Sequence, residues 1–164
     1  MRRFLSATSL VAIGFESLER LEIRGIVCDL DNTCVRRRCD VPGERETAWL
    51  RAARQRGYAV VLLSNNRSDV RVATIGRLLG VPAIARARKP WPAGFRQALR
   101  ILGTDPARTI VIGDQLFTDV LGAWAFGLGA ILVPSLGSRE EWYLRALRGL
   151  ERWCVGRLAL APLP

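Results

Sequence analysis

Apolar and polar positions alternate along this chain in blocks that predict strands and helices in turn. Five apolar runs are short, rich in Val, Ile, Leu and Ala, and bounded by glycine or polar residues; they lie at 25–28, 58–63, 81–85, 109–112 and 129–133. Short continuous apolar runs are typical of strands that are buried on both faces. The sequence therefore predicts a sheet of about five strands, with the run at 81–85 weakened by Pro82.

Between these runs, apolar residues recur at helical spacing. The expected helices begin or extend over about 42–56, 68–79, 91–102, from 118 onward, and 139–157. Strands that alternate with helices imply a parallel sheet with helices on both faces. We therefore expect a three-layer α/β/α, Rossmann-like doubly wound fold. The length of 164 residues suits a single domain, 1–164.

The first twenty residues allow two interpretations. Met1-Arg2-Arg3 followed by the apolar stretch 4–15 resembles the start of a secretory signal. No Ala-x-Ala cleavage site follows, however, and Glu16 and Glu19 come soon after. We favour an amphipathic segment, 1–20, that leads into the domain, and hence a cytoplasmic protein.

Charge and composition restrict the chemistry. The net charge is +10, with 25 Lys and Arg against 15 Asp and Glu, which favours anionic partners. No zinc-finger or RNP pattern is visible, so we do not expect a nucleic-acid partner. The chain has no histidine, which excludes Ser-His-Asp triads and histidine zinc sites. Cys28 is expected in the core; Cys34 and Cys39 either pair or, as in most cytosolic proteins, stay reduced.

Four polar residues lie at or just beyond the carboxyl ends of predicted strands. They are Asp29, Ser64, Lys89 and Asp114. In open parallel sheets, ligands bind at this edge, near the point where the strand order reverses. The sequence therefore predicts that these side chains converge on one site.

Asp29 and Asp31 form the most informative pair. Two carboxylates at the end of a buried strand are costly unless a cation or a reaction requires them. One can act as a nucleophile and the other as a proton donor and acceptor, with a divalent metal that screens their repulsion. A turn of Asp and Asn residues that merely closes the strand is the alternative.

The other candidates also carry alternatives. Ser64 and the amides after it, including that of Asn65, can hold a phosphate oxygen, or Ser64 can cap the next helix. Lys89 is the chain's only lysine, and it is either a phosphate-binding point charge or a surface residue. Asp114 can bind Mg2+ through oxygen, whereas Asp119 can support that site or interact with a helix dipole.

Taken together, these residues resemble the four motifs of the haloacid dehalogenase superfamily: Asp-x-Asp-x-Thr, a strand-end Ser, a Lys, and Gly-Asp-x-x-x-x-Asp. The resemblance implies Asp29 as the nucleophile that forms an aspartyl-phosphate and Asp31 as the general acid and base. It implies that Ser64 and Lys89 bind the phosphoryl group, and that Mg2+ is bound. The implied metal ligands are Asp29, Asp114 and the backbone carbonyl of Asp31, with Thr33 and Asp119 in support.

The finer match is to the YqeG-type phosphatases, which are similar to the mitochondrial phosphatidylglycerophosphate phosphatase. It is carried by Cys-Asp-Leu-Asp-Asn-Thr, Leu-Ser-Asn-Asn, Ala-Arg-Lys-Pro and Ile-Gly-Asp-Gln-Leu-Phe-Thr-Asp. Cys34 and Trp124 depart from the expected pattern, outside the chemistry. The resemblance implies hydrolysis of phosphatidylglycerophosphate to phosphatidylglycerol. The alternatives are a phosphatase of soluble or protein-borne phosphates, or a non-catalytic module that binds anionic lipid or nucleic acid.

Two features bear on the substrate. The intervals between the motifs are filled by the predicted elements, so no cap domain is expected and the site is open to a bulky or membrane-held substrate. The basic, aromatic-bearing helix at 139–157 either lies on an anionic membrane surface, which would make the protein peripheral on the inner face of the cell membrane, or packs on the sheet. Arg36, Arg37 and Arg38 either hold a second substrate anion or form a solvated loop.

Overall fold

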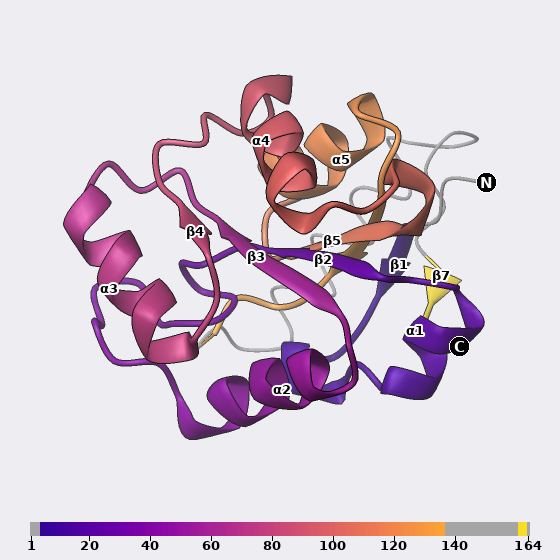
Figure 1. Ribbon diagram of the computed structural model, residues 1–164, viewed down its shortest axis with the longest axis horizontal. Helices are drawn as coiled ribbons and strands as arrows, with labels where there is room; N and C mark the ends of the chain where they lie inside the picture. Colours follow the sequence, from indigo (N-terminus) through magenta and orange to yellow (C-terminus); the bar gives the residue numbers. More distant parts are fainter. Residues whose placement is uncertain (1–3, 137–160, 164) are drawn as a thin grey trace.

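A seven-stranded parallel sheet forms the centre of the molecule (Figure 1). The computed structural model describes residues 4–136 and 161–163. The strands are β1 (Phe4–Ser6), β2 (Gly25–Cys28), β3 (Ala59–Leu63), β4 (Ala83–Ile84), β5 (Thr109–Gly113), β6 (Gly129–Leu132) and β7 (Ala161–Pro162). Their order is β4-β3-β2-β5-β6-β1-β7, and every neighbouring pair is parallel. The order reverses between β2 and β5, which is where such sheets bind ligands.

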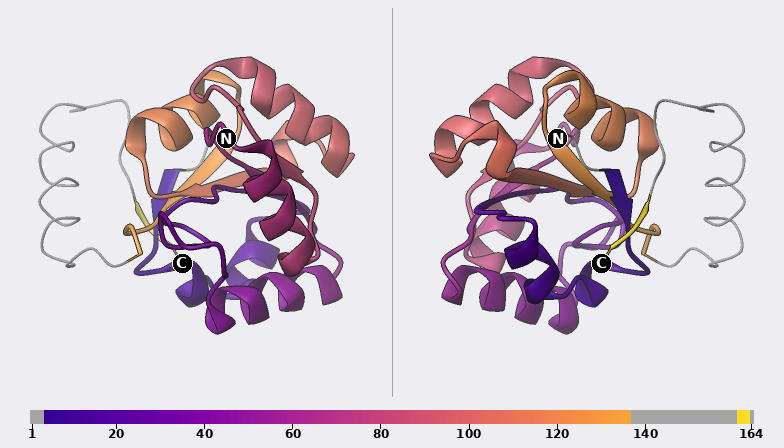
Figure 2. Two further views of the ribbon diagram at one scale, coloured as in Figure 1. Left: turned by 90° about the vertical axis from the view of Figure 1, so that its left-hand side faces the viewer. Right: turned by 90° about the vertical axis from the view of Figure 1, so that its right-hand side faces the viewer.

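Helices cover both faces of this sheet, as Figure 2 shows from the two sides. The α-helices are α1 (Phe15–Arg20), α2 (Glu44–Gln55), α3 (Asp69–Leu79), α4 (Pro92–Leu102) and α5 (Leu121–Ala125). Shorter turns are η1 (Leu10–Ala12), η2 (Pro106–Arg108) and the π-helix η3 (Leu116–Val120). Apolar side chains of α1, α2 and α3 join the core on one face, and those of α4 and α5 join it on the other. The predicted three-layer, doubly wound α/β/α fold is confirmed.

The alternation of side chains along each strand divides the core into two halves. In β2, Ile26 and Cys28 pack towards α2, whereas Val27 packs towards α4, and all three are fully buried. Successive side chains of a strand point to opposite faces, so a strand buried on both faces must be apolar at every position. This requirement explains the continuous apolar runs from which the strands were predicted.

The five predicted strands are all present, and two short strands extend the sheet. β1 lies within the amphipathic segment 1–20 and pairs with β6, while β7 pairs with β1. Phe4 and Leu5 are buried in the core, so this segment is part of the domain's packing. The predicted helix at 139–157 lies outside the described residues. Among the residues described, no helix is long and apolar enough to cross a membrane.

The helix expected from Thr118 begins differently. Residues 116–120 form the π-helix η3, and the α-helical turn α5 starts only at Leu121. A π-turn widens the helix by one residue and is common at functional sites. Here it places Asp119 inside the protein, where the side chain is 1% exposed.

Replacement of Gly76 by alanine is expected to lower stability, although alanine is the better helix former. A Cβ atom at Gly76 would lie 2.8 Å from the Cβ of Ala83 and 2.9 Å from the carbonyl oxygen of Val81, where α3 packs on β4. Overpacking of this kind costs about 1–3 kcal/mol. Urea unfolding measures the effect. Val70→Ala, at an exposed position of the same helix, is the control, and a Gly76→Ala protein as stable as this control would contradict the packing argument.

Candidate active site

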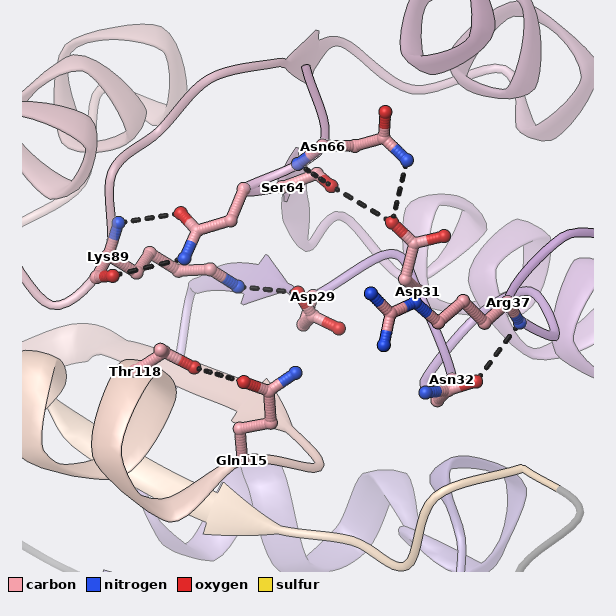
Figure 3. Close-up of a pocket in the computed structure, with 10 residues that line it drawn as sticks. Asp29, Asp31, Asn32, Arg37, Ser64, Asn66, Lys89, Gln115 and Thr118 are labelled. Atoms are coloured by element: carbon pink, nitrogen blue, oxygen red, sulfur yellow. Dashed lines mark hydrogen bonds and ion pairs between the residues drawn. The ribbon is translucent and has the colours of Figure 1, made fainter. Parts of the chain in front are cut away.

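Three of the four polar side chains predicted to converge, Asp29, Ser64 and Lys89, line one cavity (Figure 3), and the fourth, Asp114, offers an oxygen within 4.8 Å of one from Asp29. Asp29 follows β2, Ser64 follows β3 and Asp114 follows β5, while Lys89 lies in the loop after β4. A cavity of about 300 Å3 opens there. Its lining residues are Asp29, Asp31, Asn32, Arg37, Ser64, Asn65, Asn66, Lys89, Gln115 and Thr118.

Lys89 holds two carboxylates together in the floor of the site. Its Nζ atom lies 2.5 Å from Asp29 Oδ1 and 2.6 Å from Asp119 Oδ1. Burial disfavours the charge of the lysine, but the attraction of the two carboxylates outweighs it and raises the pKa of the ammonium. Lys89 is therefore a fixed positive charge in the protein interior. The alternative of a surface lysine is wrong, because its side chain is only 2% exposed.

Asp119 is a structural partner of this centre. Its Oδ2 atom accepts a hydrogen bond of 3.1 Å from the backbone N–H of Gln115. Burial raises the pKa of Asp119, against the opposing effect of Lys89. A Cβ atom on Gly113 would lie 2.4 Å from the carboxyl carbon of Asp119, so only glycine leaves room for it. The alternative, in which Asp119 only interacts with a helix dipole, does not explain its buried ion pair with Lys89.

Three carboxylates gather where a cation can bind. Asp29, Asp114 and Asp119 each offer one oxygen within 4.8 Å of the others. Asp29 Oδ2 and Asp114 Oδ1 are buried with no hydrogen-bond partner in the part of the chain that the structure describes, which is costly unless another group satisfies them. With Lys89, these groups carry a net charge of −2, and hard carboxylate oxygens suit a divalent cation. The residues therefore fit a divalent metal.

The pKa values reflect the crowding of these acids. Burial raises the pKa of Asp114 to about 6, with the nearby charge of Asp29 adding to the effect and a hydrogen bond from Ser135 opposing it. Burial likewise raises the pKa of Asp29 to about 6, although Lys89 favours its ionised form. A bound cation would favour the ionised form of both groups.

Asp31 points away from this acidic centre, towards α3. Its Oδ1 atom lies 2.8 Å from a guanidinium nitrogen of Arg71, and its Oδ2 atom accepts a hydrogen bond of 3.1 Å from Asn66. Arg71 also binds Asp40, at 2.8 Å. Neither Arg71 nor Asn66 was predicted from the sequence to be a site residue. Asn66 adjoins the Ser-Asn pair and was visible there, whereas Arg71 has no local signal that separates it from the other arginines.

Ser64 and Asn65 shape the opposite wall of the cavity. The Ser64 hydroxyl lies 3.5 Å from Asp31 Oδ2 and accepts a hydrogen bond from the backbone N–H of Asn66. The alternative of Ser64 as a helix cap is wrong, because Ser68 caps α3 by accepting from Arg71 N. The side-chain amide of Asn65 bonds both the N–H and the carbonyl of Lys89, at 2.6 and 3.0 Å. Asn65 thus fixes the backbone that carries the lysine.

The loop after Asp31 is closed on itself. Asn32 has a left-handed backbone, with φ at 66°, and its side chain accepts a hydrogen bond from Arg37 N. Thr33 is buried, and its hydroxyl has no partner among the described residues. Cys34 is also buried, with its sulfur 3.1 Å from that of Cys28, and Cys39 is exposed. Cys34 and Cys39 are not paired with each other, and neither forms a disulfide within the described residues.

Proteins of known family with similar sequences indicate the class of protein to which this chain belongs. A family model described as HAD-hydrolase-like matches residues 86–149. The chain is 36% identical over 143 residues to the probable phosphatase YqeG of Bacillus subtilis, covering 87% of this chain and 83% of that protein. It is 35% identical over 114 residues to a phosphoserine phosphatase of Thermus thermophilus, covering 65% of this chain and 45% of that protein.

The fold is found in solved structures as well. A cobalt-bound phosphatase of deoxy-D-mannose-octulosonate 8-phosphate from Haemophilus influenzae matches with a TM-score of 0.58 at 16% identity, over 87% of this chain and 96% of that one. The fold and the acidic site are those of a phosphatase that can hold a divalent metal. The chain belongs to the YqeG-type phosphatases of the haloacid dehalogenase superfamily.

Without metal, the protein is expected to lose stability as the pH rises from about 4 to about 6. The pKa of Asp114 is near 3.8 in the unfolded chain and about 6 in the folded one. Between these values the folded state retains a proton that the unfolded state has released, so rising pH favours unfolding. The shift corresponds to roughly 3 kcal/mol. Thermal melts in a chelator, across this pH range, measure the loss.

Addition of Mg2+ should restore stability mainly above pH 6, where the carboxylates are ionised. Asp114→Asn removes the titrating group, so its melts should depend less on pH and respond less to Mg2+. Glu44→Gln changes an exposed carboxylate at the start of α2 and serves as the control. An Asp114→Asn protein with the unchanged pH profile would show that the assignment of the loss to Asp114 is wrong.

Proposed function

We propose that the protein hydrolyses phosphate monoesters with Mg2+, through an aspartyl-phosphate on Asp29, and that its substrate is phosphatidylglycerophosphate. The observation that carries the proposal is the Asp29 carboxylate, which lines the cavity beside the Lys89 ammonium. Nearby acids make the ionised form of Asp29 less favourable, and a metal held by Asp29, Asp114 and the backbone carbonyl of Asp31 would offset that effect. When bound, Mg2+ supplies positive charge that stabilises the charge on the transferring phosphoryl group.

In the first step, an oxygen of Asp29 forms a bond to phosphorus while the bond to the ester oxygen breaks. Asp31 gives a proton to that leaving oxygen. In the second step, water attacks phosphorus and Asp31 takes its proton. The bond between phosphorus and Asp29 then breaks, which releases inorganic phosphate and restores the carboxylate. Asp31 lies two residues from Asp29 and lines the same cavity, as these roles require.

Binding of the phosphoryl oxygens falls to Ser64, Lys89 and the backbone after Ser64. Both side chains line the cavity beside Asp29. Lys89 offers a compact charge, and Asn65 holds the lysine backbone in place. In this proposal Thr33 supports the Asp29 loop from its buried position, and Asp119 supports Lys89.

A lipid substrate is favoured by the openness of the site and the basic character of the chain. The connection from Asp31 to β3 contains only the loop and α2, and that from Ser64 to β4 contains only α3, so neither holds a cap domain. A site without a cap domain in these two connections admits a monoester attached to a bulky group. We propose that the protein acts on the cytoplasmic face of the membrane, where its net charge of +10 is attracted to anionic lipid.

Asp29→Asn is expected to reduce phosphate release to background, because an amide cannot form the acyl-phosphate. The rate of phosphate release is measured with Mg2+ on phosphatidylglycerophosphate in mixed micelles. The same rate is measured on soluble esters such as sugar phosphates and phosphoserine. Asp105→Asn, an exposed acid outside the cavity lining, is the matched control. Retained turnover in Asp29→Asn would show that the nucleophile is another residue, whereas activity on soluble esters alone would contradict the lipid substrate.

Asp31→Asn is expected to lower kcat about 10²- to 10⁴-fold, the usual contribution of general acid–base catalysis. Arg71 acts as a positioning residue for Asp31, so Arg71→Gln should lower kcat less, about tenfold, with little change in KM. Esters with a better leaving group, such as a nitrophenyl phosphate, need less protonation and should be hydrolysed with a smaller loss in Asp31→Asn. Release of the leaving group in the first turnover measures the acid role apart from the second step, in which Asp31 is the base. An equal loss in that rate for good and poor leaving groups would contradict the role of Asp31 as the acid.

A further inference from the structure

A second cavity lies beside the first and shares a residue with it. It has a volume of about 480 Å3 and is lined by Asn65, Arg67, Arg86 and Arg88. Asn65 also lines the cavity of Asp29. The three arginines come from the loops that follow β3 and β4, which are joined by the hydrogen bond of 2.9 Å from Arg86 N to Asn66 O. The two cavities are therefore neighbours on one edge of the sheet.

The second cavity is positively charged. Arg86 is paired with Asp69, at 3.0 Å. Neither Arg67 nor Arg88 has an ion-pair partner within residues 4–136 and 161–163. Among the described residues, none that lines this cavity is acidic. Two arginine charges thus face an open cavity without compensation, which favours an anion there.

The backbone that presents these arginines is unusual. Arg86 and Arg88 have φ values of 50° and 54°, in the left-handed region that side chains other than Gly, Asn and Asp seldom adopt. Such a conformation costs free energy and persists where the surroundings enforce it, commonly at ligand-binding sites. The two residues flank Ala87, whose N–H bonds Ser64 O at 2.9 Å. The same segment then leads directly to Lys89.

We propose that Arg67, Arg86 and Arg88 bind a second phosphate of the substrate, while its monoester lies at Asp29. This inference rests on the proposed function and names the class of substrate that the site selects: an ester with a further phosphate a few bonds from the reacting one. Guanidinium groups bind phosphate oxygens through paired hydrogen bonds. In phosphatidylglycerophosphate, the phosphate diester stands one glycerol away from the monoester and supplies this second anion.

The arginines of the segment Arg36–Arg38 are not part of the second cavity. Of its three arginines, only Arg37 lines the catalytic cavity, and Figure 3 shows its side chain extending towards Asp31. Arg37 thus lies within the catalytic cavity itself. None of the three lines the second cavity, so the second anion is assigned to the loops after β3 and β4.

Three ligands with the same reacting group test the assignment. They are glycerol phosphate, the deacylated headgroup glycerophosphoglycerophosphate, and intact phosphatidylglycerophosphate in micelles of neutral detergent. The full chain with Asp29→Asn serves for calorimetric binding with Mg2+, so the result does not depend on turnover. Arg67→Gln and Arg88→Gln are combined in this background, and Arg100→Gln, an exposed arginine in the last turn of α4, is the matched control.

The headgroup is expected to bind about tenfold more tightly than glycerol phosphate, because each exposed charge contact changes an equilibrium several-fold. The Arg67→Gln, Arg88→Gln pair should remove this advantage and leave glycerol phosphate binding nearly unchanged. An equal weakening of both ligands, or of neither, would overturn the proposal. Weakening confined to the micellar lipid would also overturn it, since the arginines would then contact a lipid surface. If no ester is hydrolysed by the unmodified protein, the proposed function fails while the binding result still decides this inference.

Discussion

The buried ammonium of Lys89 is the interaction on which the site depends. It joins a carboxylate at the end of β2 to another in η3, across 60 and 30 positions of sequence. Without it, Asp29 and Asp119 would be two like charges in the interior, and the loss of one partner from such a group is strongly destabilising. A planar guanidinium would not replace a compact ammonium between two oxygens. This explains why a chain that otherwise uses arginine for its positive charges has a lysine here.

The strands of the sheet could be predicted because each central strand is covered on both faces and must be apolar throughout. β1 could not, since Phe4–Ser6 is short and its partner β6 lies more than a hundred residues away in sequence. The boundary of the helix after β5 was also missed. Nothing in local helical spacing distinguishes a π-turn from an α-turn, and here the wider turn is needed to bring Asp119 under Lys89.

The acids of the site were predictable for a different reason: a carboxylate at the end of a buried strand conflicts with its surroundings, and the conflict is visible in the sequence. A residue of another element that forms an ion pair with such a carboxylate cannot be recognised from its own surroundings in the sequence. Arg71 forms an ion pair with Asp31 from the first turn of α3. Nothing in the sequence around Arg71 distinguishes it from the other arginines of the chain. Ser64 as the cap of α3 was left open as an alternative, because the sequence alone does not show which of the polar residues before the helix accepts from its first turn; the structure gives that place to Ser68.

The strand order has a consequence for synthesis of the chain. β1 is made first, but its neighbours β6 and β7 are made last, and β2 has only β3 beside it until β5 follows. An emerging chain therefore carries an apolar strand edge until β5 follows, and Asp29 lacks its lysine until Lys89 has been made. Exposed strand edges and apolar surface invite association with other chains. The order of pairing thus withholds a complete active site until β5 and η3 have been added.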